Sequence, residues 1–390
     1  MIDFSLTEEQ RLIRENAHQF VRKEVMPLES EVLHRAVRGG PDELTRDELT
    51  ELQQKARKLG FWGADTPAEY GGAELDSVTQ ALLHEECGKT FIGFQFGGAA
   101  MNVLYLLNHE QKKEYLIPCI EQERRACFAL SEPGVGSDAR GIKTSAVRRG
   151  DEWIINGEKT WISGGNDADF AMVFCRTPEE ADPNSVTAFL VDRAMGWTSS
   201  RIRMMGAHDP ASLVFDNVRV PARNLVGEVG GGFRIAMQFI YKNRGWHLGG
   251  RNVGTAERLL GMAMDWSENR ITFGERLAER ENIQWMIAES EIEIRAAKMM
   301  VLNCAWQADN EMDYRHAACV SKFYVANMAN RVVDRVLQIH GGMGYAKEMP
   351  IEKWYRDMRI QRIWEGTDEM NLRWIFRNLR AGRQEIGELS

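Results

Sequence analysis

One glutamate stands where a carboxylate could act as a base. In the stretch RIWEGTDEM, residues 362–370, Glu365 follows Trp364 and precedes a Gly-Thr step, at a point where a helical pattern breaks. A large apolar ring can exclude water from a neighbouring carboxylate and raise its pKa, so that it can accept a proton from a weakly acidic carbon. An exposed loop glutamate is the alternative interpretation of the same residues.

A first glycine-rich segment, CFALSEPGVGSDARG at 127–141, contains the spacing G-x-G-x-x-A. A dinucleotide-binding fingerprint requires a helix directly after it, and here Gly141 and β-branched residues follow. We therefore do not expect a Rossmann site. A loop that offers backbone N–H groups and hydroxyls to a ligand is the better interpretation.

A second glycine-rich segment, QIHGGMGYAKE at 338–348, follows a helical pattern. Two interpretations stay open. The glycines could end a helix in the left-handed conformation. Alternatively, Gln338 and the bare backbone at Gly341 and Gly342 could let a phosphate or a ribose approach closely.

The tryptophans divide into two kinds. Trp285 and Trp306 fall at helical spacing, and we expect them in the core. Trp161 neighbours Ser163 in a β-rich run, where a flat ring and a hydroxyl could flank a planar cofactor.

Composition favours a small-molecule partner. The chain has 390 residues, 44% of them hydrophobic, which allows a large core and suggests two or three structural units. Its net charge of −8, with both signs spread along the chain, argues against nucleic acid and against a basic membrane-binding patch.

Cysteine spacing and the N-terminus bear on the compartment. The six cysteines fall singly, without a C-x-x-C pair or a histidine at metal-ligand spacing, so we expect buried free thiols and no metal site. The start MIDFSLTEEQ lacks the features of a signal peptide, and no run of about 18 apolar residues occurs. A cytoplasmic protein without a membrane span is predicted.

The first 125 residues are predicted to be helical. Thr7 and Gln10 have the spacing of a capping box at the start of a helix over 5–20. Further helical patterns cover 44–60, 77–88, 95–108 and 110–122.

The middle of the chain has strand patterns. EWIINGEKTWIS at 152–163 consists of two β-rich runs around Asn156-Gly157, and it predicts a hairpin with a type I′ turn. Three more strands are predicted in DFAMVFCRT, VTAFLVDR and ASLVFDNVRVP. Together these segments predict a small β-domain over 126–228.

The last part of the chain is predicted to be a helical bundle over 229–390. Nine of the ten prolines lie at or before Pro221, so long helices are possible beyond it. Two stripes have alternating steps of four and three: Ile283, Ile287, Ser290, Ile294, Ala297, Val301 and Cys304, and then Cys319, Phe323, Ala326, Asn330, Val333 and Leu337. Thr367 is a plausible N-cap, which places Glu365 at a joint between helices.

These features together resemble one family. The chain is similar over its whole length to the acyl-CoA dehydrogenases, flavoenzymes that desaturate acyl-CoA thioesters between Cα and Cβ. The resemblance rests on ALSEPGVGSDARG at 129–141 and on QIHGGMGYAKEMPIEKWYRD at 338–357 with the EGT step after it. It implies a mostly α fold: an N-terminal helical domain (1–125), a small β-barrel or sandwich (126–228) and a C-terminal four-helix bundle (229–390).

The resemblance implies FAD as the cofactor and assigns roles to individual residues. The flavin ring would be lined by Phe128, Leu130, Ser131, Trp161 and Ser163. Arg270, Thr272 and Phe273 resemble the family's R-x-T-F-G, whose arginine meets the FAD pyrophosphate across a subunit interface. The adenosine half would be held by Gln338, Gly341 and Gly342, and completed by Thr367 and Glu369. The acyl-CoA substrate would be contacted by Ser137, Arg244, Gly366 and Arg377.

The implied reaction is removal of an α-proton by Glu365 while a β-hydride passes to flavin N5. The backbone N–H of Glu365 would stabilise the enolate, and Trp364 would exclude water. Branched-chain members place their base near 243–245, where this chain has Asn-Arg-Gly. One residue more than usual separates Arg244 from Gly254, and Glu281 stands where many members have Gln.

The implied partners are an electron-transfer flavoprotein and further copies of the chain, as a dimer of dimers, in fatty-acid or lipid metabolism. Small residues in FQFGGAAMN at 94–102 would lie on a helix lining the acyl pocket and leave room for a long, branched or cyclic tail. An acyl-CoA oxidase, a flavin monooxygenase and a non-catalytic helical scaffold are the alternatives on the same fold.

Overall fold

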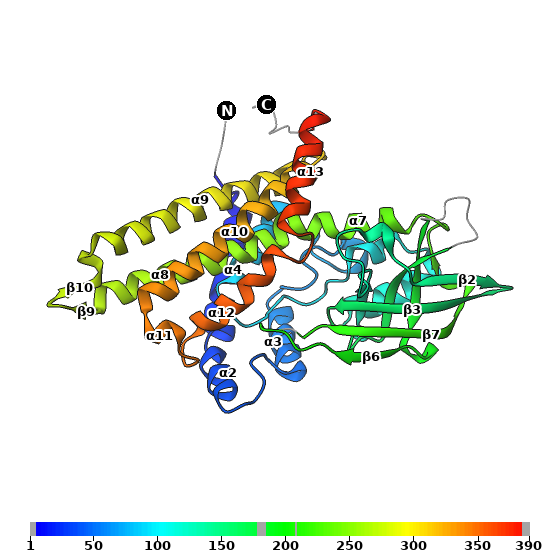
Figure 1. The fold of residues 1–390 in the computed structure, drawn as a ribbon, viewed down its shortest axis with the longest axis horizontal. Coiled ribbons are helices and arrows are strands. Elements are labelled where there is room, and N and C mark those ends of the chain that lie inside the picture. Colours follow the sequence, from blue (N-terminus) through cyan, green and yellow to red (C-terminus); the bar gives the residue numbers. More distant parts are fainter. Residues whose placement is uncertain (1–4, 178–184, 207–208, 384–390) are drawn as a thin grey trace. The chain divides into compact units, whose positions relative to one another are not determined.

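The computed structural model describes residues 5–177, 185–206 and 209–383, and its ribbon is drawn in Figure 1. The chain forms two compact units. Unit 1 comprises Met1–Asp65, Glu74–Phe96 and Tyr241–Ser390, and unit 2 comprises Thr66–Ala73 and Gly97–Ile240. The N-terminal helices up to Gly88 therefore pack in the same unit as the C-terminal helices, whereas the helical turns of 102–120 belong to unit 2. The domain boundaries expected at 1–125, 126–228 and 229–390 stay a prediction.

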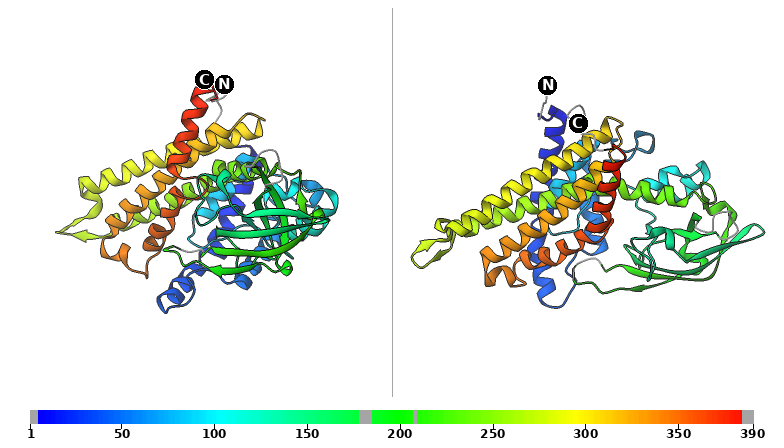
Figure 2. Two further views of the ribbon diagram at one scale, coloured as in Figure 1. Left: turned by 45° about the vertical axis from the view of Figure 1, so that its right-hand side comes forward. Right: turned by 45° about the horizontal axis from the view of Figure 1, so that its top comes forward.

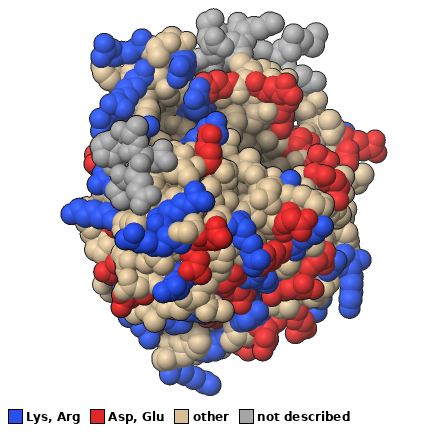
Figure 3. Space-filling view, turned by 90° about the vertical axis from the view of Figure 1, so that its right-hand side faces the viewer, with Lys and Arg blue, Asp and Glu red and all other residues tan. Residues whose placement is uncertain are grey.

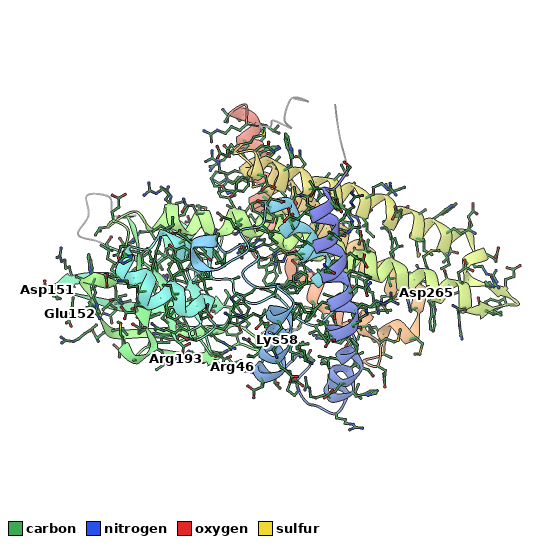
Figure 4. All side chains as sticks on the ribbon, turned by 180° about the vertical axis from the view of Figure 1, so that it is seen from behind. Arg46, Lys58, Asp151, Glu152, Arg193 and Asp265 are labelled. Carbon is green, nitrogen blue, oxygen red and sulfur yellow. The ribbon has the colours of Figure 1, made fainter. Side chains whose placement is uncertain are left out.

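The N-terminal helices of unit 1 begin where their caps predict. Thr7 and Gln10 form the expected capping box at α1 (Glu8–Phe20), which a π-helical turn extends to Val25. α2 (Leu28–Val37) is followed by α3 (Arg46–Lys58), whose two ends are labelled in Figure 4, and by α4 (Ser77–Gly88). The helices predicted at 44–60 and 77–88 are thus confirmed.

The helix predicted over 95–108 is wrong. Residues 95–101 are not helical, and only a short 3₁₀ helix, Asn102–Leu106, follows. Gly98 has φ of 83°, a left-handed conformation that interrupts a right-handed helix. The roomy acyl pocket inferred from small residues on that helix therefore loses its basis. The next prediction, 110–122, is confirmed by α5 (His109–Gln111), a π turn and α6 (Ile117–Ile120).

Three long helices and α4 form the bundle of unit 1. α8 (Leu248–Asn269), α9 (Glu281–Asp309) and α10 (Arg315–His340) lie side by side in Figures 1 and 2 and pack on one another, and α8 and α9 also pack on α4. The chain then continues through α11 (Gly342–Tyr345), α12 (Pro350–Arg359) and α13 (Asp368–Arg380).

The predicted stripes face the bundle core, whereas two tryptophans do not. Ile294 on α9 and Val333 on α10 are among the buried stripe residues. Trp285 and Trp306, predicted in the core, are 60% and 44% exposed. They share α9 with the buried stripe but lie on a different face, so helical spacing alone did not fix their burial.

Glycines allow α8 to approach α4 closely. A Cβ atom at Gly250 would lie 2.5 Å from the Ala81 carbonyl oxygen, and one at Gly254 would lie 1.8 Å from the Glu85 carbonyl oxygen. No side chain fits there, so the two helix backbones are in contact.

Unit 2 is built on one mixed sheet in the order β6-β7-β3-β2-β4-β5-β8, with β1 beside β4. Its strands are β1 (Ala126–Ala129), β2 (Ser145–Arg149), β3 (Glu152–Ile162), β4 (Phe170–Arg176), β5 (Val186–Asp192), β6 (Thr198–Arg201), β7 (Ala211–Pro221) and β8 (Leu225–Val226). The three single strands predicted from the sequence correspond to β4, β5 and β7.

The hairpin predicted around Asn156-Gly157 is wrong. β3 runs without a turn through this dipeptide, and the hairpin forms instead between β2 and β3 at Gly150, beside Asp151 and Glu152 at its tip in Figure 4. Asn156-Gly157 marks a β-bulge opposite β7. Gly157 is required there because a Cβ would lie 2.5 Å from the Thr144 hydroxyl.

Both faces of the central strands are buried. Along β4, Phe170, Met172 and Phe174 belong to one apolar cluster, whereas Ala171, Val173 and Cys175 belong to another. Helical residues cover the first cluster and the curled β3 and β7 cover the second, as in a sandwich or barrel.

The cysteines and the charged side chains are distributed as the sequence predicts. All six cysteines are buried with free thiols, as predicted. Acidic and basic side chains are interleaved over much of the face seen in Figure 3. In the part of the chain that the structure describes, no helix is long and apolar enough to cross a membrane.

Candidate active site

Glu365 lies at the predicted joint between helices. A 3₁₀ turn, Ile360–Arg362, precedes it, and Thr367 caps α13 by accepting a hydrogen bond from the Met370 N–H at 3.3 Å. Glu365 has φ of 53°, which is uncommon for a long side chain. Such a conformation costs free energy and concentrates at functional sites.

Burial dominates the environment of the Glu365 carboxyl group. It raises the pKa of Glu365 to about 7, although the charges of Arg244 and Lys322 and a hydrogen bond from Asn243 oppose the shift. The oxygen Oε2 is buried and has no hydrogen-bond partner among the described residues. The carboxyl group is therefore poised to take up a proton near neutral pH.

Two buried cations hold the backbone of this joint. Arg244, in the π-helical turn Asn243–His247, donates from Nε to the Glu365 carbonyl, and Lys322 on α10 donates from Nζ to the Gly366 carbonyl at 2.7 Å. Burial also lowers the pKa of Lys322 to about 8. The cations thus fix where the carboxylate sits while burial still controls its protonation.

Gly366 is required by the same contacts. Its φ is 91°, and a Cβ there would lie 2.3 Å from Nη2 of Arg244. The EGT step therefore lets the guanidinium approach the main chain.

Other residues expected near Glu365 lie in different surroundings. Arg244 is only 5% exposed, so its place beside Glu365 differs from a surface contact with the nucleotide end of CoA. Trp364 is half-buried, and its indole N–H donates to Gln361 at 3.0 Å. Arg377 is exposed on α13, with its guanidinium 5.3 Å from the Trp374 ring.

Unit 2 presents an exposed aromatic ring of its own. Trp161 is 55% exposed with φ of 60°, at a β-bulge near the end of β3. Ser163 is also exposed, whereas Ile162 between them is buried. A strained, exposed indole beside a hydroxyl suits the edge of a flavin ring.

A buried ion pair holds the neighbouring loop against β3. Lys159 Nζ donates to the Leu130 carbonyl at 3.0 Å and to Glu132 Oε1 at 2.8 Å. The Thr160 N–H donates to the Ser131 carbonyl at 2.9 Å. The expected flavin-lining residues Leu130, Ser131 and Trp161 are thereby brought together.

Two other site residues expected in unit 2, Phe128 and Ser137, make different contacts from Leu130, Ser131 and Trp161. Phe128 stacks on Phe239 of α7 (Gly232–Lys242), with ring centroids 4.4 Å apart. Ser137 is exposed in the loop after β1.

The residues expected to hold the adenosine half lie at the far end of α10. Gln338 is in the last turn, and Gly341 ends the helix with φ of 59° and ψ of −137°, so the helix does end here but not in the left-handed conformation. A Cβ at Gly341 or Gly342 would meet open space. This bare backbone therefore fits the close approach of a phosphate or ribose.

One chain does not gather all the expected FAD contacts. Lys322 contacts the joint before Thr367 and Glu369, and Gln338 lies about 24 Å further along α10 at 1.5 Å per residue. Arg270, Thr272 and Phe273 lie on the β9–β10 ribbon (Ile271–Thr272 with Glu275–Arg276), where the Phe273 side chain is 97% exposed.

Sequence reasoning missed Lys322. The available signal was the position of this lysine between the stripe residues Cys319 and Phe323. The structure shows that it is 4% exposed, and a buried cation needs a partner. Asn243 was noted only as the absence of an acidic residue, and its hydrogen bond to Glu365 depends on the tertiary fold.

Three family models match the chain in order: the acyl-CoA dehydrogenase N-terminal domain at 7–123, the middle domain at 127–218 and the C-terminal domain at 230–380. (R)-Benzylsuccinyl-CoA dehydrogenase of Thauera aromatica is 35% identical, over 95% of both chains. A caffeyl-CoA reductase–Etf complex subunit of Acetobacterium woodii is 32% identical, over 93% of this chain and 96% of its own length. Butyryl-CoA dehydrogenase from Megasphaera elsdenii has a similar structure, with a TM-score of 0.85 at 29% identity, over 97% of this chain and 100% of the other.

Proposed function

The chain belongs to the acyl-CoA dehydrogenase family and is an FAD-dependent oxidoreductase, and on this premise we propose that Glu365 is the base for desaturation of an acyl-CoA between Cα and Cβ. The relatives' names include dehydrogenases and a reductase, so the same step could run in either direction. The product of the forward direction is the trans-2-enoyl-CoA.

The observation that carries the proposal is the buried, unpartnered Oε2 of Glu365 together with the pKa of about 7. A carboxylate without a hydrogen-bond partner on one oxygen can accept a proton there. A base contributes most when its pKa lies near the working pH. Asn243 cannot replace it, because an amide is not a base.

The chain's own groups also provide for the charge that forms on the substrate. When a proton leaves the α-carbon, negative charge develops on the thioester oxygen, and a preorganised N–H donor stabilises it. We assign this role to the backbone N–H of Glu365, since Arg244 and Lys322 fix the main chain there. FAD, when bound, would supply an acceptor for the hydride of the β-carbon.

Each unit has residues that fit one part of FAD. The exposed Trp161 ring with Leu130, Ser131 and Ser163 suits the flavin, and the bare backbone at Gly341-Gly342 suits the adenosine half. We infer that a second copy of the chain brings the Arg270 ribbon or the end of α10 to this cofactor, because within one chain the end of α10 lies about 24 Å from the joint. A dimer of dimers is the proposed assembly.

An electron-transfer flavoprotein is the proposed electron partner. Support comes from the relative that is a subunit of a reductase–Etf complex. The acyl group is not fixed by the relatives, whose names include a butyryl and a benzylsuccinyl thioester.

The test is anaerobic reduction of the bound flavin by a panel of acyl-CoA thioesters. Wild type should bleach, and Glu365→Gln should keep FAD but reduce it about 10²–10⁴-fold more slowly, as loss of a general base predicts. Glu311→Gln is the matched control, because Glu311 also has a positive φ, 55°, but is exposed in the turn between α9 and α10. Reduction at the wild-type rate in Glu365→Gln would contradict the assignment, and abundant hydrogen peroxide in air would indicate an oxidase.

A further inference from the structure

A second group of titratable side chains lies on the helices beside Glu365. His84 on α4 and His247, in the turn before α8, have ring centroids 4.3 Å apart. The charges of Arg251 and of Lys242 act on both imidazoles. We call His84, Lys242, His247 and Arg251 the basic cluster.

The basic cluster carries more positive than negative charge. Lys242 pairs with Asp65 at 2.8 Å. Arg251 donates to the Phe94 carbonyl at 2.5 Å, and across the described residues no carboxylate pairs with it. A guanidinium removed from water without an opposite charge is costly, so such a group usually has an anionic partner.

Its members are enclosed without being part of the packed core. Burial is the largest cause of the lowered pKa of His84, His247 and Arg251. All three nevertheless remain partly accessible to solvent, unlike the buried core residues around them. These three side chains are therefore withdrawn from bulk water without being sealed off from it.

The cluster is aligned with the candidate base. Asn243, His247 and Arg251 are four residues apart in succession, so they follow one face of the helical segment. Asn243 bonds the Glu365 carboxyl group, and Arg251 lies no more than about 12 Å further along, because an α-helix rises 1.5 Å per residue and the π-helical turn Asn243–His247 rises less. An acyl group of a few carbons whose α-carbon lies at Glu365 would therefore have its distal end at the basic cluster.

One histidine is already oriented for such a ligand. Gln80 Oε1 accepts from Trp246 Nε1 at 3.1 Å and lies 3.3 Å from His247 Nε2, which assigns the proton to Nε2. Burial and the charges of Lys242 and Arg251 lower the pKa of His247 to about 3, so its imidazole is neutral and Arg251 supplies the positive charge.

We propose that the basic cluster binds a carboxylate at the distal end of the acyl group, so that the substrates are monothioesters of dicarboxylic acids. This inference rests on the proposed function, because it takes Glu365 as the point where the α-carbon lies. Arg251 supplies the charge that pairs with the carboxylate, and His84 and His247 line the approach. The CoA phosphates lie on the other side of the thioester and do not compete for this position.

The test compares thioesters that differ only at the distal end. Glutaryl-, adipyl- and pimelyl-CoA are each paired with the monocarboxylic acyl-CoA of the same carbon number, and kcat/KM for anaerobic flavin reduction is measured. At least one dicarboxylic thioester should have a higher kcat/KM than the monocarboxylic acyl-CoA of the same carbon number. Arg251→Gln should lower that preference about 100-fold, a size typical of removing one partner of a buried charge pair, and Arg251→Lys should retain most of it.

Two controls separate binding from folding. Arg258→Gln removes an arginine from the same helix that lies 3.9 Å from Glu29, outside the cluster, and should leave the preference unchanged. In Glu365→Gln, where Arg251 is intact, the flavin absorbance shift on titration should give tighter binding of the dicarboxylic thioester than of its partner.

The outcomes distinguish this inference from the proposed function. Reduction by the monocarboxylic series alone, or a preference unaffected by Arg251→Gln, would overturn the inference and leave the function standing. If Arg251→Gln lowered kcat/KM equally for the dicarboxylic and the monocarboxylic thioesters, Arg251 would only support the loop at Phe94, and the inference would be wrong. If no thioester reduces the flavin, both the function and the inference are wrong.

Discussion

Arg244 is hydrogen-bonded to the main chain of Glu365, and its charge also acts on the carboxylate. The guanidinium donates to the carbonyl of Glu365, while Oε2 of the same glutamate is buried without a partner. A direct bidentate pair would strongly favour the ionised carboxylate and depress its pKa. The observed arrangement fixes the loop and still leaves burial to raise the pKa to about 7.

Gly366→Ala tests this arrangement. The new Cβ would lie 2.3 Å from Arg244 Nη2, so the guanidinium must move and the Glu365 carbonyl loses its donor. We expect flavin reduction to slow by at least about tenfold, since small displacements of a base are costly. Gly60→Ala is the control, because Gly60 has φ of 88° but open space around it. Gly60→Ala should strain the backbone about as much as Gly366→Ala does, but it should leave the rate of flavin reduction unchanged.

The rate of flavin reduction should depend on pH through Glu365. Burial raises the pKa of this acid to about 7, so the protonated form, which cannot act as a base, dominates below that pH. The rate should therefore fall about tenfold per pH unit below pH 7 and level off above it. We call this fall in rate on the acid side of the pH profile the acid limb. An acid limb centred near the ordinary pKa of glutamate would contradict the conclusion that burial raises the pKa of Glu365.

Lys322→Met should move that acid limb. The charge of Lys322 lowers the pKa of Glu365, so its removal should raise the pKa and shift the limb to higher pH. Lys113→Met removes an exposed lysine paired with Glu110 and should leave the limb in place. Rapid-mixing absorbance across a pH series measures both variants.

Local signals were enough for much of the fold. Thr7 and Gln10, three residues apart, meet in a capping box, and the stripe from Ile283 to Cys304 needs only the helical period. Glu365 was placed at a joint because Thr367 caps the next helix. In each case the decisive interaction lies within one or two turns of chain.

Errors arose where a distant segment decides the structure. Asn156-Gly157 can form a turn, but the close approach of Thr144 makes it a bulge in a continuous strand. Lys322 and Arg244 meet the Glu365 joint from elements 44 and 121 residues away. No local pattern encodes such pairings.

The buried pair Lys159–Glu132 should be essential to unit 2. The two side chains are 0% and 6% exposed, and Lys159→Met would leave the Glu132 carboxylate without its cation. Breaking a buried pair typically costs about 3–5 kcal/mol of folding free energy. Adding Glu132→Gln should recover part of it. Urea unfolding followed by circular dichroism measures the change, and Lys113→Met, at an exposed pair, should cost less than about 1 kcal/mol.

The exposed face of α9 should be an interface between copies of the chain. Trp285, Ile292, Met299 and Trp306 recur every seven residues, and Ile292 and Met299 are 67% and 42% exposed. Seven residues are nearly two helical turns, so the four side chains form one apolar line. A continuous apolar stripe of this kind on a surface helix indicates association.

Replacing both Trp285 and Trp306 by Glu should therefore reduce the size of the particle. Two charges buried at each copy of the interface would oppose its closure, and light scattering during gel filtration should show at most half the wild-type mass. Leu59→Glu is the control, because Leu59 is 66% exposed but stands alone at the end of α3. An unchanged mass for the double variant would place the interface elsewhere, whereas loss of FAD together with mass would indicate that the cofactor site needs the second copy.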